Sequence, residues 1–161
     1  MSFQIHALPA ARFADLFALS DADLRARNAR RMVVNTYPGT PCRVSMVDAA
    51  VGETVILANF THQPANTPYR ASHAVFVREG ASQACFAAGE VPAVLRTRLI
   101  SLRLYDPDHL MIDADVVEGT GLANALETAF EAANVTYVQL HYAKPGCFAA
   151  HATRAGCSRG S

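Results

Sequence analysis

Residues 99–118 read LISLRLYDPDHLMIDADVVE, and this stretch predicts the architecture of the chain. From Ile100 onward every second side chain of residues 99–105 is apolar, which is typical of a strand with one buried face. The alternation returns in residues 110–117, after the turn-forming residues 106–109. We therefore predict two antiparallel strands joined by this turn.

The register of the predicted pair follows from the alternation. Cross-strand neighbours point to the same face of a sheet, so we expect Leu104 to lie opposite Leu110. The same register places Arg103 on the polar face, together with Asp113 and Asp115. An ordinary cross-strand ion pair is the simplest interpretation of these three charges.

Outside this hairpin the chain alternates between strand and helix signals. Apolar residues at helical spacing predict one long amphipathic helix over residues 120–133. Near the N-terminus, Ser20 precedes Asp23 by three residues, as in a capping box, and predicts a short helix through Arg27. The other segments with strand character are residues 3–8, 32–35, 53–60, 73–79 and 135–142.

These elements predict an α+β fold with a mostly antiparallel sheet, an N-terminal helical segment and one long amphipathic helix packed on the sheet. The chain of 161 residues has the usual length of one domain. We expect a single domain over residues 1–153. The small polar residues 154–161 are expected to form a disordered tail.

The amino-acid composition argues against nucleic acids and membranes as partners. Lys plus Arg and Asp plus Glu both number 14, so no net positive charge attracts nucleic acid. No apolar run has the length of a membrane span, and the N-terminus lacks the regions of a signal peptide. We expect a cytoplasmic protein without nucleic-acid or membrane partners. Its four cysteines are then expected to be thiols.

Two similar turns place a cysteine next to a Pro-Gly corner: residues 38–43, which end in Cys42 and Arg43, and residues 144–147, which end in Cys147. A guanidinium beside a thiol favours the reactive thiolate, so Cys42 is a candidate nucleophile. Cys147 follows His141, a candidate base. The alternative is that both cysteines are small buried hydrophobic residues.

The loop of residues 61–72 carries His62, Tyr69 and Arg70, which could hydrogen-bond a small anionic ligand. Alternatively, prolines and local hydrogen bonds only stiffen this loop. The histidine and cysteine spacings match no zinc pattern, and no dinucleotide or phosphate-loop motif is present, so we predict neither a metal nor a cofactor.

Four arginines gather within residues 25–31. The helix dipole and nearby acids explain most of them locally, and an anion-binding role is the alternative interpretation. They are Arg25, Arg27, Arg30 and Arg31.

Several blocks in sequence order resemble the bacterial DUF1203 family over residues 3–155. They are Pro41-Cys42-Arg43-Val44-Ser45, Pro68-Tyr69-Arg70-Ala71-Ser72, Asp113-Ala114-Asp115-Val116-Val117-Glu118-Gly119 and His141-Tyr142-Ala143-Lys144-Pro145-Gly146-Cys147-Phe148-Ala149. The resemblance implies a small bacterial protein of a family with no known function, so it supplies no catalytic residue. The chain departs from the family pattern at His73 and His151, and the resemblance assigns no role to either.

Two hypotheses of different classes follow. In the first, the candidate site residues converge on one pocket for a small anionic molecule, either as an enzyme with a cysteine nucleophile, a histidine base and an arginine clamp, or as a binding protein without turnover. In the second, the protein is structural and forms a homodimer through an exposed sheet edge. The candidate site residues are Cys42, His141 and Cys147 as catalytic groups, and Arg43, His62, Tyr69 and Arg70 as ligand-binding groups.

Overall fold

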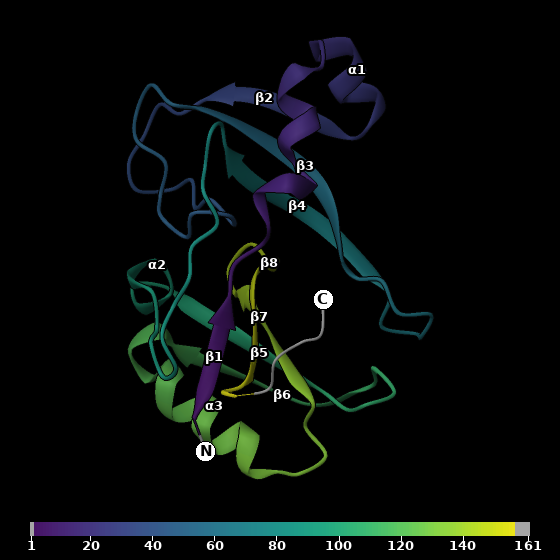
Figure 1. Ribbon diagram of the computed structural model, residues 1–161, viewed down its shortest axis with the longest axis vertical. Helices are drawn as coiled ribbons and strands as arrows, with labels where there is room; N and C mark the ends of the chain where they lie inside the picture. The colour runs from purple at the N-terminus through teal and green to yellow at the C-terminus, as the bar shows by residue number, and fades with distance from the viewer. Residues whose placement is uncertain (1, 157–161) are drawn as a thin grey trace. The chain divides into compact units, whose positions relative to one another are not determined.

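A computed structural model describes residues 2–156 and shows two antiparallel sheets with few helices, which is an α+β fold (Figure 1). The chain groups into two units, each containing one of the sheets. The five-stranded unit contains the residues up to His6, Ala65–Arg70, and the residues from Cys85 on. The three-stranded unit contains Ala7–Pro64 and Ala71–Ala84. The single domain over residues 1–153 stays a prediction.

The sheet of the five-stranded unit has the order β1-β8-β7-β5-β6, with every neighbouring pair antiparallel. Helix α3 contacts both edge strands, β1 and β6, and therefore crosses one face of the sheet. The elements are β1 (Phe3–His6), α2 (Ala93–Arg96), β5 (Leu99–Tyr105), β6 (Met111–Glu118), the 3-10 helix η3 (Gly119–Gly121), α3 (Leu122–Glu131), β7 (Tyr137–Tyr142) and β8 (Cys147–Arg154).

The face under α3 is the apolar core of this unit. Side chains of α3 and of β5 line one shared groove, which places the helix on the Leu102 and Leu104 face of β5. The helix buries three large side chains completely, Leu122, Leu126 and Phe130. Glu127 and Glu131 are exposed. The helix has ten residues and is shorter than the predicted range of residues 120–133.

Arg154 holds the C-terminal end of α3. Its guanidinium donates hydrogen bonds to the carbonyls of Phe130, Ala132 and Val135 at 3.0, 2.8 and 2.6 Å. These carbonyls lack partners within the helix, and a cation there also favours the helix dipole. Arg154 was expected in the tail, yet it is the last residue of β8. Residues 157–161 of the predicted tail lie outside the described residues.

Strand β8 was not predicted from the sequence pattern, and neither was the short helix α2. Strand β8 lies between β1 and β7, although residues 135–142 were predicted to be the last strand. Its sequence, CFAAHATR, contains three alanines and has no alternation of polar and apolar residues. Alanine has little intrinsic preference for strands, so the position of β8 depends on the hydrogen bonds of both neighbours.

The predicted register of the first hairpin is wrong. Leu104 pairs with Asp113, not with Leu110, and a bulge separates this pair from Tyr105 and Met111. The turn is longer than expected because Asp106 Oδ1 accepts the N–H groups of Asp108 and Leu110, both at 2.9 Å. An odd shift in register moves side chains to the other face of a sheet. Asp113 therefore shares a face with Leu104, and Arg103 pairs with Ala114.

Asp113 and Asp115 protect the free edge of β6. The carboxylate of Asp113 accepts the N–H of Ala114, and that of Asp115 accepts the N–H of Val116, both at 2.8 Å. Edge strands present unpaired N–H groups that invite another strand, and these bonds occupy two of them. The spacing of the two aspartates thus has a structural reason.

The sheet of the three-stranded unit has the order β2-β3-β4, and one of its faces packs against short helices. The core on this face includes Leu24, Ala29, Ile56 and Ala58, with Leu16, Phe17 and Leu19 packed against it. The elements are the 3-10 helices η1 (Ala10–Arg12) and η2 (Ala14–Ala18), α1 (Asp21–Ala26), β2 (Ala29–Val33), β3 (Thr54–Gln63) and β4 (Ala71–Arg78).

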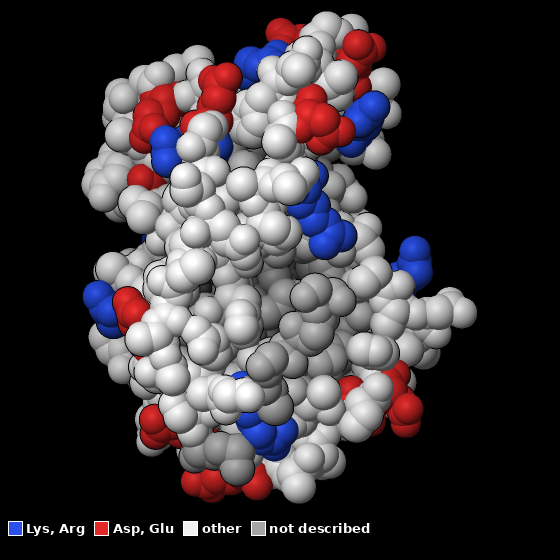
Figure 2. All heavy atoms as spheres, in the orientation of Figure 1, with Lys and Arg blue, Asp and Glu red and all other residues white. Residues whose placement is uncertain are grey.

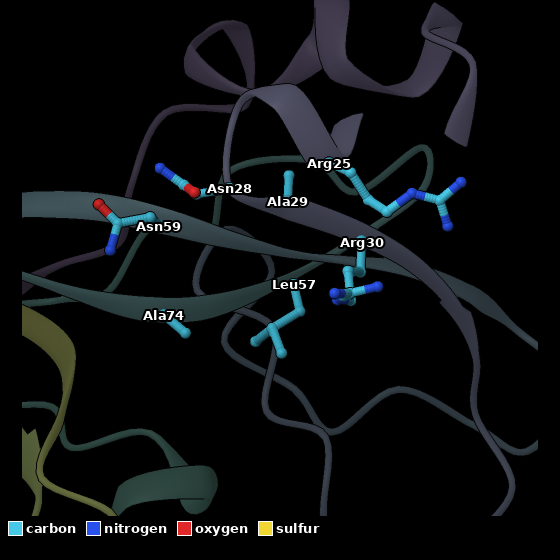
Figure 3. A pocket seen from close by; sticks show the side chains of 7 residues that line it. All are labelled: Arg25, Asn28, Ala29, Arg30, Leu57, Asn59 and Ala74. Carbon is cyan, nitrogen blue, oxygen red and sulfur yellow. The ribbon is translucent and has the colours of Figure 1, made fainter. Parts of the chain in front are cut away.

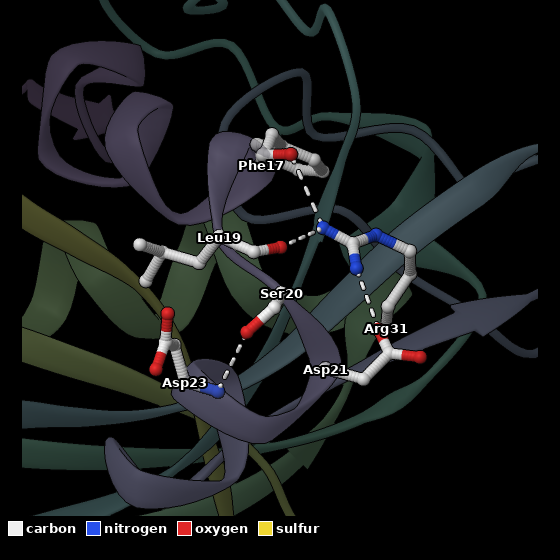
Figure 4. Close-up of polar contacts among 6 residues, drawn as sticks. All are labelled: Phe17, Leu19, Ser20, Asp21, Asp23 and Arg31. Carbon is white, nitrogen blue, oxygen red and sulfur yellow. Dashed lines mark hydrogen bonds and ion pairs between the residues drawn. The ribbon is translucent and has the colours of Figure 1, made fainter.

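The predicted N-cap at Ser20 is confirmed. Its hydroxyl accepts the N–H of Asp23 at 3.1 Å at the start of α1 (Figure 4). Arg31 on β2 joins the same corner, since it pairs with Asp21 at 2.6 Å and donates to the carbonyls of Phe17 and Leu19. This arginine therefore fixes the segment that enters α1.

No helix within residues 2–156 is long and apolar enough to cross a membrane.

Replacement of Gly119 by alanine should be strongly destabilising. A Cβ there would lie 1.9 Å from the carbonyl oxygen of Leu95 and 2.7 Å from the carbonyl carbon of Arg96, so backbone must move. We expect Gly119→Ala to lower the free energy of unfolding by about 3 kcal/mol in urea titrations. The control is Gly121→Ala, where a Cβ meets nothing within 4 Å, and it should stay within about 1 kcal/mol of wild type. Equal stability of the two variants would contradict the packing of α2 on η3.

Removal of the two edge carboxylates should promote self-association. We expect the average molar mass of Asp113→Ala/Asp115→Ala, measured by light scattering, to rise with protein concentration, because two N–H groups of β6 become available for pairing. The charge-matched control is Glu127→Ala/Glu131→Ala, which removes two exposed carboxylates from α3. A monodisperse Asp113→Ala/Asp115→Ala variant, or association of both variants alike, would rule out the protective role.

Candidate functional site

The predicted site residues divide between the two units. Cys42, Arg43 and His62 belong to the three-stranded unit. Tyr69, Arg70, His141 and Cys147 belong to the five-stranded unit. A single pocket that contains all seven residues therefore stays a prediction, and each group is described within its own unit.

The thiol of Cys42 lies in the interior. The residue is 1% exposed, and its Sγ accepts the N–H of Ser45 at 3.4 Å and that of Arg78 at 3.3 Å. Its own N–H donates to the carbonyl of Val47, and its carbonyl accepts the N–H of Met46. Residues 42–47 thus form a tight loop around this sulfur.

Arg43 is the largest of the fully buried side chains, at 1% exposure. Its guanidinium donates to the carbonyl of Pro41 at 2.6 Å. Its backbone N–H donates to the carbonyl of Phe76, and its carbonyl accepts the N–H of Leu8, both at 3.0 Å. The backbone of Arg43 thus connects the segments of Leu8 and Phe76, while its buried guanidinium donates to a carbonyl two residues away.

His62 was expected in a loop and instead lies near the end of β3, where it is 4% exposed. The pairing of β3 with β4 is interrupted by a bulge between Phe60 and Gln63, next to this histidine. The bulge explains why the sequence pattern of the strand breaks there.

His141 and Cys147 are assigned to opposite faces of the five-stranded sheet. His141 pairs with Phe148, whereas Cys147 pairs with Tyr142. Neighbouring side chains along a strand alternate between faces, and paired residues share a face. The register thus assigns the imidazole and the thiol to different faces, and their catalytic pairing stays a prediction. Cys147 is 7% exposed.

The face opposite α3 carries a row of polar side chains, which we call the polar row. The register pairs His6 with His151, His151 with Gln139, and Gln139 with Arg103. Directly opposite residues in antiparallel strands have Cβ atoms about 5 Å apart. Two imidazoles, one carboxamide and one guanidinium thus follow one another across four strands.

Aromatic contacts run beside the polar row. Tyr105 stacks on Tyr137 with ring centroids 5.0 Å apart, and Tyr69 contacts Tyr105 edge-on at 6.3 Å. From Tyr137 the contacts continue to His151 at 6.1 Å and from His151 to Phe148 at 5.0 Å. A final contact of 5.7 Å joins Phe148 to His141. These rings connect two predicted site residues, Tyr69 and His141, on one face of the sheet.

Hydrogen bonds fix the orientation of several of these groups. The Nδ1 atom of His109 lies 2.8 Å from the hydroxyl of Tyr137. The Nε2 atom of His141 lies 3.2 Å from Gln139 Oε1, and that of His6 lies 2.8 Å from the hydroxyl of Thr153. These hydrogen bonds restrain side chains of the polar row and the rings beside it.

Arg103 differs from the other members of the polar row. It is half-buried, and no hydrogen bond or ion pair joins its guanidinium to another of residues 2–156. Its expected partners Asp113 and Asp115 lie on the other face of the sheet. β6 does place one carboxylate on this face, that of Glu118. It lies four residues along the strand from Ala114, the partner of Arg103, which is a distance of about 13 Å.

Part of this face was predictable from the sequence. Tyr69 and His141 are among the predicted site residues, whereas His6, Arg103, Tyr105 and His151 are not. The signal was present in β7, where Tyr137, Gln139 and His141 alternate with apolar residues. Within residues 2–156 no three His, Cys, Asp or Glu side chains gather closely enough to hold a metal ion.

The fold and this face define an α+β protein with a polar, histidine-rich sheet face. Residues 39–154, which are most of the chain, match the family described as Protein of unknown function (DUF1203). The chain belongs to this family, and the predicted resemblance is confirmed. No curated protein and no solved structure matches the chain.

Alkylation of the native protein should distinguish reactive thiols from buried ones. Cys85 is exposed and serves as the reference within the same chain. We expect Cys42 and Cys147 to react about 100-fold more slowly than Cys85, because the protein must open before reagent reaches them. The rates are measured by mass spectrometry and should become similar in denaturant. A native Cys42 or Cys147 that reacts faster than Cys85 would instead identify an activated thiol.

Proposed function

We propose that this protein binds a small anionic molecule at the polar row. The observation that supports the proposal is the half-buried guanidinium of Arg103, which has two imidazoles in its row and no nearby carboxylate on its face. Removing a cation from water costs free energy, and pairing with an anion offsets that cost. A bound carboxylate, phosphate or sulfate group would provide that partner.

The aromatic side chains suit the remainder of such a ligand. The stacked rings of Tyr105 and Tyr137 offer an apolar surface with hydroxyl groups at its edge. Tyr69 is 38% exposed, and Arg70 follows it in the same segment of the five-stranded unit. Both were predicted ligand-binding residues, and we assign them to the rim of this site.

The burial of the thiols supports binding without turnover rather than catalysis by a cysteine nucleophile. Cys42 and Cys147 are both buried, and His141 is assigned to the face opposite Cys147. A cysteine nucleophile needs access to its substrate and a base within reach. Catalytic roles for these three residues stay predictions, as do the ligand-binding roles of Arg43 and His62.

The homodimer is the second candidate function, and the exposed apolar residues of edge strand β2 favour it. Met32 is 43% exposed and Val33 is 64% exposed at the free edge of the three-stranded sheet. The protected edge of β6 is the less suitable one for pairing. The mass of the wild-type protein in the light-scattering measurement described above decides between monomer and dimer.

A panel of anions tests the proposed site. Inorganic phosphate, sulfate, oxalate and citrate are added at constant ionic strength, and binding is followed by thermal unfolding and calorimetry. We expect at least one of them to stabilise the wild-type protein, by about 2.7 kcal/mol at 100 times its Kd. Arg103→Gln should weaken this binding about tenfold or more, because it removes the charged donor.

The matched control is Lys144→Gln, which removes one exposed cation from a turn of the same unit. It should leave the affinity within about twofold of wild type. Equal losses in both variants would mean general charge attraction, and an anion that binds Arg103→Gln as tightly as wild type would contradict the site. Absence of binding by all four anions would also contradict it.

A further inference from the structure

A second polar site lies in the three-stranded unit, where α1 meets the edge strand β2. A hollow of about 410 Å³ is lined by Arg25, Asn28, Ala29, Arg30, Leu57, Asn59 and Ala74 (Figure 3). The register pairs Arg30 with Leu57 and Asn59 with Ala74, so these four residues share one face. Arg25 and Asn28 come from α1 and from the residues that follow it.

Local contacts account for only two of the four neighbouring arginines. Arg27 pairs with Asp15 at 3.7 Å, and Arg31 pairs with Asp21 at 2.6 Å. Arg25 and Arg30 have no hydrogen bond or ion pair from their guanidinium groups to any other described residue. Both line the same hollow, and no acidic side chain lines it.

The polar groups have a definite arrangement in the hollow. Figure 3 shows the guanidinium groups of Arg25 and Arg30 toward one end, and the carboxamides of Asn28 and Asn59 toward the other. The backbone connects the two asparagines, because the N–H of Asn59 donates to the carbonyl of Asn28 at 3.1 Å. Leu57 lies between the two ends and provides an apolar floor.

We propose that this hollow binds a small phosphorylated molecule. Two guanidinium groups without acidic partners match a phosphate or diphosphate group, which arginine binds through paired hydrogen bonds. The two carboxamides both donate and accept hydrogen bonds, so they suit a body with donors and acceptors, such as a nucleobase. The volume lies within the range of sites for small organic ligands and exceeds what phosphate alone fills.

The charge distribution favours a small ligand over a nucleic-acid strand. The chain has equal numbers of acidic and basic residues. On the face drawn in Figure 2, blue and red groups are interspersed and no broad basic surface is present. A polyanion gains most from an extended basic surface, whereas two arginines beside one hollow suit one or two phosphate groups.

The test uses the full-length protein and three probes: ADP, inorganic pyrophosphate and adenosine. We expect calorimetry at constant ionic strength to show binding of ADP and weaker binding of pyrophosphate, with no measurable binding of adenosine. Arg25→Gln/Arg30→Gln should weaken the binding of ADP about tenfold or more. Asn59→Ala should weaken the binding of ADP and leave the affinity for pyrophosphate unchanged.

The matched control is Arg27→Gln, which removes a cation from the same cluster outside the hollow. It should change the affinity for ADP by less than about threefold, since its exposed ion pair contributes little. A loss as large as that of the double variant would show general charge attraction and overturn the site. Absence of ADP and pyrophosphate binding to wild type, or binding that survives Arg25→Gln/Arg30→Gln, would also overturn it.

The two proposed sites can fail separately. Arg103→Gln should leave ADP binding at the hollow unchanged, and Arg25→Gln/Arg30→Gln should leave anion binding at the polar row unchanged. ADP binding that Arg103→Gln abolishes would assign the probe to the polar row and overturn the proposal for the hollow.

Discussion

The alternation of side chains in the five-stranded sheet is the constraint on which the rest of that unit depends. Strands β5 and β7 supply apolar residues to the face under α3 and polar residues to the other face. β7 shows this clearly, with Val138 and Leu140 on the core side and Gln139 and His141 on the polar side. A change of one residue in register would exchange the two faces, so the core and the candidate site are fixed together.

Helix α3 can cover the apolar face because both of its ends are held. At its start, Gly119 lets the chain approach the backbone of α2 more closely than any side chain would permit. At its end, Arg154 binds the last carbonyl groups from β8. The strand that completes the sheet thus also secures the helix, and its pairing with both neighbours offsets its weak strand propensity.

Two sets of arginines in this protein differ in their partners. Arg31, Arg43 and Arg154 donate to backbone carbonyls, so they have structural roles. Arg103 in one unit, and Arg25 with Arg30 in the other, have no such partner among the described residues. Because arginine is always charged, a guanidinium that pairs with no other described residue suits an anionic ligand.

The sequence by itself determined the α+β class, most of the strands, the N-cap at Ser20 and the family, because these depend on local periodicity, local capping and motif order. It also selected Tyr69 and His141 from one face of the sheet. Only the tertiary structure decided the partners of Asp113 and Asp115, the existence of β8 and the position of Cys147 relative to His141. These features depend on turn length, on bulges and on hydrogen bonds between strands distant in sequence, and local propensity carries no information about them. The polar row is of the same kind, since its four residues come from four strands and become neighbours only through the register.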